Sequence, residues 1–540
     1  MKLERQTDAR WWQRGVIYQI YPRSFHDMNG DGVGDLAGVI HRLPYLAELG
    51  VDAIWLSPVF RSPMADFGYD ISDYKTIDPL FGTLEDCDRL VEAAHAQGLK
   101  VILDLVPNHT SDQHPWFTES RAGRANPKRD WYIWRDGAPD GGAPNNWLSD
   151  FGGSAWQYDP ASDQYYYHAF LASQPDLNWR NPEVRAAIYD VMRFWLARGI
   201  DGFRVDVIWH LIKDDQFRDN PVNPAFGAGS PPHNAVIPLY TADRPEVHEV
   251  IAEMRSVIDE FAGRLLIGEI YLPIEKLVAY YGRDLSGVHL PFNFALLSAP
   301  WEAGSLAKLI ADYEAALPTG GWPNWVLGNH DRPRIAGRIG PRQARLGAML
   351  LLTLRGTPTI YYGDEIGLQQ VAIPLERLHD PVATSVPDHA LGRDGCRTPM
   401  QWDGSAYAGF SAVEPWLPLS DDWRERNAAE QKHDQRSIYW LYRRLIELRR
   451  SNQVLLQGSY RTILARGDLL LFIREYSGHR LLVALNLGND PASLNFEEGT
   501  LRGRLVLSSS LDREDEDVDG RLDLRDAEGV IISLSQDAEV

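Results

Sequence analysis

The sequence predicts an α/β fold, a (β/α)8 TIM barrel with a small domain inserted after strand 3 and a C-terminal antiparallel β-sandwich domain. Eight short apolar runs alternate with longer amphipathic stretches, an irregular stretch separates the third run from the fourth, and alternating strand patterns follow residue 460. The alternative is an open doubly wound sheet. The count of eight runs and the lack of a GxGxxG motif after the first favour the barrel.

The predicted barrel strands are nearly continuous apolar runs, as strands buried on both faces require. They cover residues 15–21, 51–58, 100–108, 202–208, 265–271, 289–294, 325–331 and 356–363. The stretches LAGVIHRLPYLAELG, TLEDCDRLVEAAHAQG and NPEVRAAIYDVMRFWLARG between them have helical periodicity, and each ends in a glycine typical of a helix C-terminus. We therefore assign residues 1–108 and 178–459 to the barrel.

Two stretches interrupt this alternation. Residues 109–177 are rich in Pro, Gly, Asn and aromatic residues, which indicates a separate inserted domain. Residues 364–432 form a second irregular stretch after the eighth strand, before the helical pattern RSIYWLYRRLIELRRSN. The runs LLLFIREY, HRLLVALNL, LRGRLVLS and GVIISL then predict an antiparallel β domain over residues 460–540.

Composition narrows the class of ligand. The chain has 540 residues with 54 Lys and Arg against 75 Asp and Glu, and its net charge of -21 argues against nucleic acid or an anionic membrane as a partner. It has only two cysteines, no apolar signal-peptide core and no apolar run long enough to span a membrane. We expect a cytoplasmic protein that acts on small uncharged molecules.

Polar residues stand at the ends of the predicted strands. They are Asn108 and His109 after strand three, Arg204 and Asp206 in strand four, Glu269 in strand five, and Asn329, His330 and Asp331 in strand seven. Because the C-terminal ends of barrel strands form one shared mouth, we expect these side chains to converge there. The competing interpretation is that each acidic residue caps a helix or turn and that the histidines close polar gaps at the rim.

Two carboxylates with separate roles are what glycosidic cleavage requires. Arg204 lies two residues before Asp206, on the same strand face, and a guanidinium there is expected to keep that aspartate ionised. Glu269 stands in the apolar run LLIGEIY, where burial favours the protonated form that a general acid needs. Asp331 is left to hold sugar hydroxyls during ring distortion.

The stretch DMNGDGVGD, residues 27–35, has the rhythm of a calcium-binding loop. Its hard oxygen donors are the side chains of Asp27, Asn29, Asp31 and Asp35 and the carbonyl of Val33, which suit Ca²⁺ or, second, Mg²⁺. An EF-hand is excluded because its twelfth position is Gly38 and a strand precedes it. The alternatives are a structural ion without a part in catalysis and a turn that binds nothing.

Four segments resemble those of the α-amylase family, glycoside hydrolase family 13: DLVPNH, GFRVDVIWH, GEIY and VLGNHD. The stretches QPDLNW, ADFGYDISDY, RGTPTIYYGDEIG and GRDGCRTPMQWD are similar to motifs of its α-glucosidase and oligo-1,6-glucosidase branch. The resemblance covers essentially the whole chain. Arg332, Trp209 and His210 depart from the branch pattern near the mouth.

This resemblance implies a retaining mechanism with Asp206 as nucleophile, Glu269 as acid and then base, and Asp331 as transition-state stabiliser. It also implies a pocket for the non-reducing terminal glucose, formed by Asp66, Tyr69, His109, Arg204, His330 and Arg397, with Phe170 and Gln174 at its wall. Asp66 with Arg397 is expected to hold the 4-hydroxyl, which makes the enzyme exo-acting. Val207 is similar to the residue of α-1,6-acting members, and family members with calcium in the first loop favour an ion there.

Three functional classes remain in competition. The first is an exo-acting α-glucosidase or oligo-1,6-glucosidase that hydrolyses short α-glucosides. The second is a glucosyltransferase or sugar isomerase of the same fold, because sugar can intercept the covalent intermediate in place of water. The third is a non-catalytic binding protein, similar to the transporter heavy chains, which carry a membrane anchor and lack the catalytic carboxylates. This sequence has neither feature.

Overall fold

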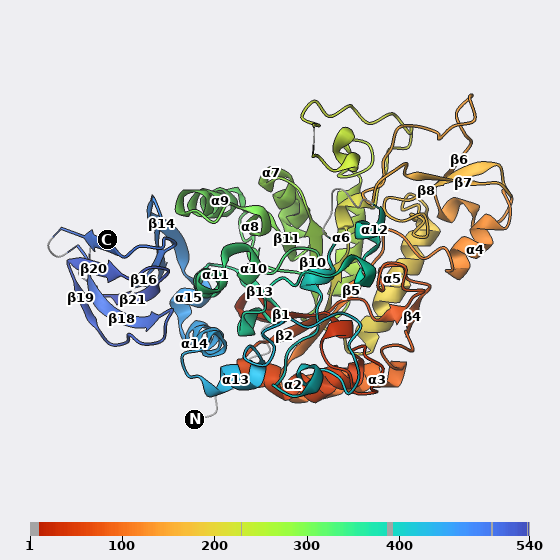
Figure 1. Ribbon diagram of the computed structural model, residues 1–540. Coiled ribbons are helices and arrows are strands. Elements are labelled where there is room, and N and C mark those ends of the chain that lie inside the picture. Colours follow the sequence, from red (N-terminus) through yellow and green to blue (C-terminus); the bar gives the residue numbers. More distant parts are fainter. Residues whose placement is uncertain (1–9, 228, 386–391, 498–499, 537, 539–540) are drawn as a thin grey trace.

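The computed structural model describes residues 10–227, 229–385, 392–497, 500–536 and 538. Its centre is a sheet of eight parallel strands in the order β11-β10-β9-β5-β2-β1-β13-β12 (Figure 1). These are β1 (Ile17–Ile20), β2 (Ala53–Leu56), β5 (Lys100–Leu105), β9 (Gly202–Val205), β10 (Leu265–Ile270), β11 (Leu290–Asn293), β12 (Asn324–Val326) and β13 (Thr357–Tyr361). Each predicted strand overlaps one of them, although β12 ends at Val326, five residues before the predicted end, so the predicted barrel is confirmed.

The barrel closes between β11 and β12 through one side chain. Asn324 accepts a hydrogen bond from the backbone N–H of Asn293 at 2.9 Å and donates one to the carbonyl of Pro291 at 2.5 Å. Proline has no N–H, so β11 lacks one of the donors that a regular ladder needs. The buried amide of Asn324 replaces the missing backbone pairing at this seam.

Side chains pointing inwards from the strands fill the barrel. Trp55, Ile102, Ile267 and Phe292 belong to this buried cluster, together with Val326. Side chains on the other face of the strands pack against the surrounding helices, which are α2 (Leu36–Leu49), α3 (Leu84–Ala96), α5 (Pro182–Ala197), α6 (Val247–Asp259), α9 (Ala303–Ala316), α11 (Pro341–Thr353) and α14 (Ile438–Ser451). The barrel is therefore a packed core whose chemistry is confined to its ends.

Local sequence sets the ends of these helices. Thr83 and Asp86 form a reciprocal capping box at the start of α3, and the side chain of Asn181 caps α5, which begins with Pro182. Gly50 ends α2 at φ 97°, a left-handed conformation that favours glycine. The three helices predicted from these stretches are present.

The segment from His109 to Leu177 lies outside the barrel. It contains α4 (Pro115–Arg121) and a three-stranded antiparallel sheet of β6 (Trp134–Arg135), β8 (Gln164–Tyr167) and β7 (Trp156–Asp159). Two isolated bridges, His109 to Asp176 and Tyr132 to Leu177, join its two ends. The segment thus leaves the barrel after β5 and returns beside its starting point, at the barrel mouth.

A further irregular segment, which the sequence does not predict, separates β9 from α6 at residue 247. Asn146 and Trp147 of the inserted domain donate hydrogen bonds to the carbonyls of Asn220 and Arg218, at 2.8 Å in both cases. The apolar residues that open this segment, IWHLI, resemble the start of a helix, but only the short turn Ile208–His210 forms. The Asp, Asn and Pro residues that follow are typical of a loop.

The stretch after β13 contains short turns, α12 (Pro381–Ser385) and α13 (Ala428–His433), and residues 386–391 within it lie outside the described residues. It packs on the loop after β1: Met400 donates its N–H to the carbonyl of Ser24 at 2.7 Å, and Trp402 donates its indole N–H to that of Phe25 at 2.7 Å. These contacts bring Arg393 and Arg397 to the barrel mouth.

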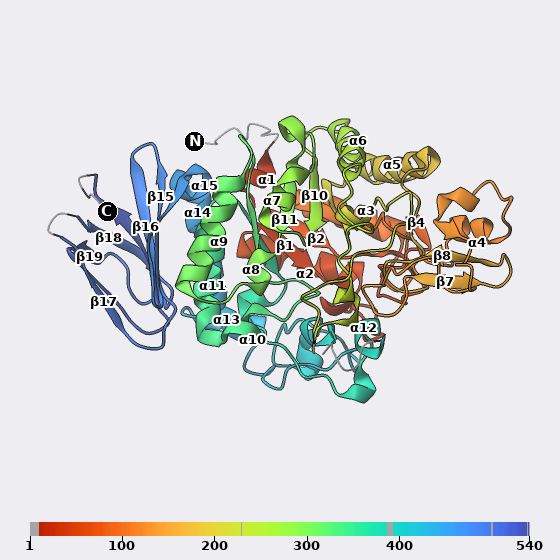
Figure 2. The same cartoon turned by 90° about the horizontal axis from the view of Figure 1, so that it is seen from above.

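The C-terminal domain begins at Ser459, one residue before the predicted boundary. A six-stranded sheet has the order β14-β15-β16-β21-β18-β19, and the pair β17 and β20 covers part of one face. Its strands are β14 (Ser459–Arg466), β15 (Leu469–Tyr476), β16 (His479–Asn486), β17 (Ala492–Asn495), β18 (Arg502–Ser508), β19 (Asp517–Asp519), β20 (Arg521–Leu524) and β21 (Gly529–Leu534). The domain lies on the opposite side of the barrel from the inserted domain (Figures 1 and 2).

The described part of the chain contains no helix with both the length and the apolar character needed to cross a membrane.

Candidate active site

A cavity of about 540 Å³ lies at the C-terminal ends of the barrel strands. It is lined by Asp66, Tyr69, His109, Asp150, Phe151, Phe170, Asp206, Val207, Trp209, His210, Glu269, Tyr271, His330, Asp331, Arg332, Pro333, Val382, Gly392 and Arg393. Most of the site residues predicted from the sequence are in this set. Gln174, Arg204 and Arg397 lie behind the wall, in contact with residues that line it.

The buried guanidinium of Arg204 holds three carboxylates. Its Nη1 donates to Asp206 Oδ1 at 2.7 Å and to Asp104 Oδ1 at 2.8 Å. Its Nη2 lies 2.8 Å from Glu269 Oε2, an ion pair whose N–H is not aligned with the oxygen. Asp206 and Glu269 are therefore held side by side on one cation, as the strand-end positions predict.

This sharing changes the expected ionisation. Burial and the neighbouring Glu269 carboxylate raise the pKa of Asp206 well above its usual value, although Arg204 opposes the shift. Burial likewise raises the pKa of Asp104 to about 7 despite Arg204. Arg204 lowers the pKa of Asp206, as expected, but burial and the neighbouring acids outweigh it, because one cation serves three buried acids.

Val207, directly after Asp206, has a strained backbone. Its φ of 35° is left-handed, which is unfavourable for a β-branched residue and costs on the order of 1–3 kcal/mol. In this conformation its N–H donates to Glu269 Oε2 at 2.8 Å. The turn thus fixes Glu269 relative to Asp206 and presents the Val207 side chain to the cavity.

Asp331 lies against two arginines and the ring of His330. Its Oδ1 accepts from Arg397 Nη2 at 3.0 Å and from Arg393 Nη1 at 3.3 Å, and its Oδ2 lies 3.4 Å from His330 Nε2. Burial alone would raise the pKa of Asp331, but His330 and the two arginines hold it well below its usual value. Asp331 is consequently an anion at ordinary pH, whereas burial and the neighbouring Glu269 carboxylate raise the pKa of Asp206.

His330 and Tyr69 form one wall of the cavity. Their rings stack at 5.3 Å, and the Tyr69 hydroxyl lies 2.6 Å from His330 Nε2 and 3.1 Å from Asp104 Oδ2. Burial lowers the pKa of His330 to about 3, so its ring is neutral at ordinary pH. A neutral ring in this position orients hydroxyl groups without adding charge.

Asp66 pairs with an arginine other than the predicted one. Its Oδ1 accepts from Arg393 Nη2 at 2.7 Å. Arg397, the predicted partner, instead donates Nε to the carbonyl of His330 at 2.8 Å and Nη2 to Asp331. The two arginines are four residues apart in GRDGCRTPMQWD, and the turn Asp394–Cys396 between them decides which one reaches Asp66.

His109, Gln174 and Phe170 come together as predicted. Gln174 Nε2 lies 3.3 Å from Asp66 Oδ2 and 3.2 Å from His109 Nε2, and the Phe170 ring packs 5.2 Å from that of His109. Burial lowers the pKa of His109. The inserted domain thereby supplies one side of the cavity.

The wall away from Asp66 contains groups that the sequence assigned no role. Arg332 lies 5.3 Å from the centre of the Tyr271 ring, which stacks on Phe294 at 4.4 Å. Asp104 also had no predicted role, although it is the only charged residue inside a buried strand motif, DLVPNH. A single acidic residue in a buried strand could have indicated a charged partner elsewhere in the chain, because a buried carboxylate requires one.

In the loop 27–35 the predicted ligand oxygens accept backbone hydrogen bonds. Asp27 accepts from Gly30 and Gly32, Asn29 from Asp31, and Asp31 from Val33, at 2.7 to 2.9 Å. Asp35 accepts from Met28, Asn29 and Gly38 and caps α2. Among the described residues, no group of three His, Cys, Asp or Glu side chains is placed to hold a metal ion. The ion stays a prediction.

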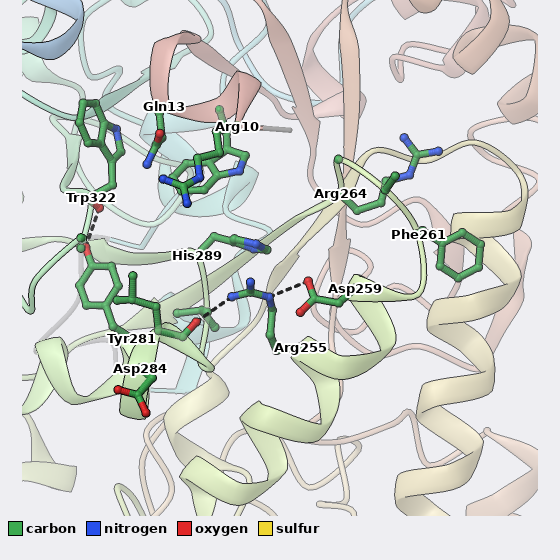
Figure 3. Close-up of a pocket in the computed structure, with 17 residues that line it drawn as sticks. Arg10, Gln13, Arg255, Asp259, Phe261, Arg264, Tyr281, Asp284, His289 and Trp322 are labelled. Atoms are coloured by element: carbon green, nitrogen blue, oxygen red, sulfur yellow. Dashed lines mark hydrogen bonds and ion pairs between the residues drawn. The ribbon is translucent and has the colours of Figure 1, made fainter. Parts of the chain in front are cut away.

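A second cavity, of about 500 Å³, lies at the opposite end of the barrel, beside the starts of β10, β11 and β12 (Figure 3). Two of its arginines already have partners: Arg255 pairs with Asp259 at 2.9 Å, and Arg264 pairs with Asp201 at 2.8 Å. Active sites of this fold form at the C-terminal face. The cavity with Asp206 and Glu269 is therefore the candidate active site.

Known proteins match this chain over most of its length. The model "Alpha amylase, catalytic domain" matches residues 19–458. A probable alpha-glucosidase of Rhizobium meliloti is 44% identical over 528 residues, 94% of this chain and 96% of that protein. An oligo-1,6-glucosidase of Heyndrickxia coagulans is 40% identical over 530 residues, 90% of this chain and 94% of that protein.

Among solved structures, that of the alpha-glucosyl transfer enzyme XgtA superimposes with a TM-score of 0.91 at 42% identity, covering 97% of this chain and 99% of that one. The sequence matches, the barrel fold and the carboxylates at the barrel mouth all indicate the same family. The chain belongs to the α-amylase family and is a glycoside hydrolase related to its α-glucosidases and oligo-1,6-glucosidases.

Proposed function

We propose that the protein is an exo-acting, retaining α-glucosidase that removes the non-reducing terminal glucose from short α-glucosides. One observation carries the proposal: Asp206 and Glu269 share the guanidinium of Arg204 at a cavity that the Asp66 and Arg393 pair also lines. We infer that this pair closes one end of the cavity. Two carboxyl groups held on one cation suit a double displacement, and the closed end admits a chain terminus but no continuing chain.

In the first step a carboxylate oxygen of Asp206 bonds to the anomeric carbon as the bond to the glycosidic oxygen breaks. That oxygen takes a proton from Glu269. In the second step water gives a proton to Glu269, and its oxygen displaces Asp206 from the anomeric carbon. Two inversions release α-glucose.

Asp331, Tyr69, His109 and His330 hold the glucose ring in this proposal. Asp331 stays ionised and accepts hydrogen bonds from ring hydroxyls that strengthen as positive charge develops on the sugar. Asp66 and Arg393 hold the 4-hydroxyl at the closed end, in place of the Asp66 and Arg397 pair expected from the sequence.

The test is a pair of variants assayed with an aryl α-glucoside. Asp206→Asn removes the nucleophile and should lower kcat by at least about 10³-fold. Glu269→Gln should lower kcat less for an aryl leaving group, which needs little protonation, than for maltose. NMR of the first product should show α-glucose. Release of β-glucose, or an unchanged rate in Asp206→Asn, contradicts the proposed mechanism.

A second candidate function is glucosyl transfer, which the similarity to an alpha-glucosyl transfer enzyme favours. The same covalent intermediate then reacts with a sugar hydroxyl in place of water. Product analysis in concentrated maltose and sucrose separates the two. Free glucose as the main product supports hydrolysis, and mainly transferred or isomerised sugars support transfer.

Linkage preference is tested separately with maltose, isomaltose, sucrose, trehalose, kojibiose and nigerose. Val207 lines the cavity next to the nucleophile. We expect preference for the α-1,6 bond, and Val207→Thr should change the isomaltose to maltose rate ratio by about 10-fold, the effect of one small group in a pocket. If the isomaltose to maltose rate ratio is unchanged in Val207→Thr, other cavity residues determine the linkage preference.

We further propose that loop 27–35 binds a structural Ca²⁺, supported by its hard oxygen donors. Residues within the loop would hold the ion through the side chains of Asp27, Asn29, Asp31 and Asp35 and the Val33 carbonyl. A chelator should then lower Tm while kcat at saturating substrate stays the same, and added Ca²⁺ should restore Tm. An Asp31→Ala variant should lose this response. If neither the chelator nor added Ca²⁺ changes Tm, hydrogen bonds alone hold the loop.

Small neutral α-glucosides are the proposed substrates, in keeping with the net charge of -21. We also propose a cytoplasmic location, supported by two buried cysteines that form no disulfide. Fractionation of cells that produce the protein tests this location, and recovery outside the cytoplasm contradicts it.

A further inference from the structure

Asp380 lies behind the candidate active site and holds Arg393 in place. Arg393 donates Nε to both carboxylate oxygens of Asp380 at 3.1 Å, Nη2 to Oδ1 at 2.8 Å, and its backbone N–H to Oδ2. The side chain of Asp380 is fully buried. Asp380 does not line the cavity, so it acts on substrate only through Arg393.

The opposite side of the same guanidinium faces the site. Nη2 donates to Asp66 Oδ1 at 2.7 Å and Nη1 to Asp331 Oδ1 at 3.3 Å. A guanidinium has five N–H donors. The contacts with described residues use Nε–H, both hydrogens of Nη2 and one of Nη1. Among the described residues no hydrogen bond uses the remaining Nη1 hydrogen, and Arg393 lines the cavity.

The position of Arg393 depends on a balance between carboxylates. Asp66 and Asp331 each attract the guanidinium, and an arginine side chain free to move would form a two-pronged pair with one of them. That pairing would use the donors that face the substrate and leave the other carboxylate with less positive charge. Asp380 opposes this movement because it fixes Nε and the backbone of Arg393 from behind.

Asp380 is itself held firmly. Asp394 Oδ2 accepts the N–H of His379 at 2.7 Å and that of Asp380 at 3.0 Å, and Asp380 Oδ1 accepts the N–H of Val382 at 3.1 Å. Burial opposes ionisation of Asp380, but Arg393 lowers its pKa below the usual value. Asp380 is therefore a fixed anion.

We propose that Asp380 is a positioning residue for substrate recognition: it holds Arg393 so that one guanidinium faces both Asp66 and Asp331 and receives the 4-hydroxyl of the terminal glucose. The inference rests on the proposed α-glucosidase function. Asp380 thus contributes to recognition of the 4-hydroxyl although it does not contact the sugar.

The experiment compares 4-nitrophenyl α-glucoside with its 4-deoxy analogue, which lacks only that hydroxyl. The quantity measured is kcat/KM for the 4-nitrophenyl α-glucoside divided by kcat/KM for its 4-deoxy analogue. Both values come from one preparation, so a loss of folded protein lowers both equally and leaves the ratio unchanged. In Asp380→Asn we expect the ratio to fall about 10-fold or more, because a site that hydrogen-bonds a hydroxyl discriminates strongly against its absence. The kcat/KM for the 4-deoxy substrate should change by less than about 3-fold.

Further variants separate positioning from general damage. Asp380→Glu keeps the charge and should recover part of the ratio. Arg393→Lys should lower the ratio on its own, and Asp380→Asn added to it should lower the ratio no further. Asp201→Asn is the matched control, because Asp201 is equally buried and paired with Lys100 and Arg264 at the other end of the barrel. It should lower Tm and leave the ratio unchanged.

The possible failures are distinct. A wild-type protein that does not cleave the glucoside contradicts the proposed function itself. A wild-type protein that cleaves both substrates equally well contradicts the role of Arg393 and, with it, that of Asp380. If Asp380→Asn slows both substrates by the same factor, Asp380 is only structural and the inference is overturned.

Discussion

At the scale of single residues, the site is organised by cations that each serve several acids. Arg204 holds Asp104, Asp206 and Glu269, and Arg393 holds Asp66, Asp331 and Asp380. The acids that share these arginines differ in ionisation. Asp331 is held ionised, whereas burial and repulsion raise the pKa of Asp206.

The raised pKa of Asp206 gives a prediction for the acid side of the pH profile. Asp206 must be ionised to attack, so kcat/KM should fall as the pH drops through its raised pKa. The charge of Asp104 contributes to that pKa by repulsion. In Asp104→Asn the pKa of Asp206 should therefore decrease, and the acid limb of kcat/KM should move to lower pH. An acid limb that stays in place or moves to higher pH contradicts this electrostatic coupling.

At the scale of elements, turns and seams place the site residues where strands alone do not. The left-handed turn at Val207 aims a backbone N–H at Glu269, and the turn Asp394–Cys396 separates the directions of Arg393 and Arg397. The inserted domain returns to the barrel at His109 and Leu177 and brings Gln174 against Asp66. Loops thus supply the recognition groups, while strands supply the reacting ones.

The seam between β11 and β12 gives a stability prediction. Asn324→Leu removes two hydrogen bonds and leaves a buried N–H of Asn293 and a buried carbonyl of Pro291 unsatisfied. At about 1–3 kcal/mol for each of the two buried groups, the free energy of unfolding should fall by about 2–6 kcal/mol. Urea unfolding measures the change. Asn223→Leu, at an exposed turn, should shift it by less than about 0.5 kcal/mol. Equal effects of the two variants would show that the seam does not depend on Asn324.

At the scale of the whole molecule, the C-terminal domain stabilises the barrel at a distance from the chemistry. One face of its main sheet joins the central core through Leu470, Phe472 and Val483. The buried Arg474 donates to the carbonyls of Thr353, Leu455 and Gly458, where the barrel and this domain meet. The domain and the cavity share no residue, so damage to this interface should reduce stability before it reduces catalysis.

Gly529 allows this interface to be tested with one methyl group. A Cβ there would meet Met349 of α11 at 2.7 Å and Leu485 of β16 at 2.8 Å. Gly529→Ala should lower Tm, at a cost of about 1–3 kcal/mol for overpacking, with kcat at saturating substrate unchanged. The control is Gly304→Ala in α9, where a Cβ meets no atom within 4 Å, and it should raise stability by about 0.4–1 kcal/mol. Loss of kcat in Gly529→Ala below its Tm would couple the domain to catalysis.

The sequence by itself determined the eight strands, the order of the domains and the reacting carboxylates, because these follow from local patterns. Apolar periodicity marks each strand, and position at the end of a predicted strand marks Asp206, Glu269 and Asp331, although β12 ends at Val326 and Asp331 lies in the loop that follows it. The sequence also indicated the family, because each family motif lies within one short stretch of the chain.

Only the tertiary structure decided which groups share a cation. Asp66 and Arg393 meet across 327 residues of sequence, and Arg204 reaches Asp104 across 100. No local pattern encodes such pairs, and the ionisation of Asp206 depends on all of them together. Secondary structure and the candidate nucleophile could be predicted because their causes are local. Partner choice and pKa could not, because burial and long-range electrostatics exist only once the chain has folded.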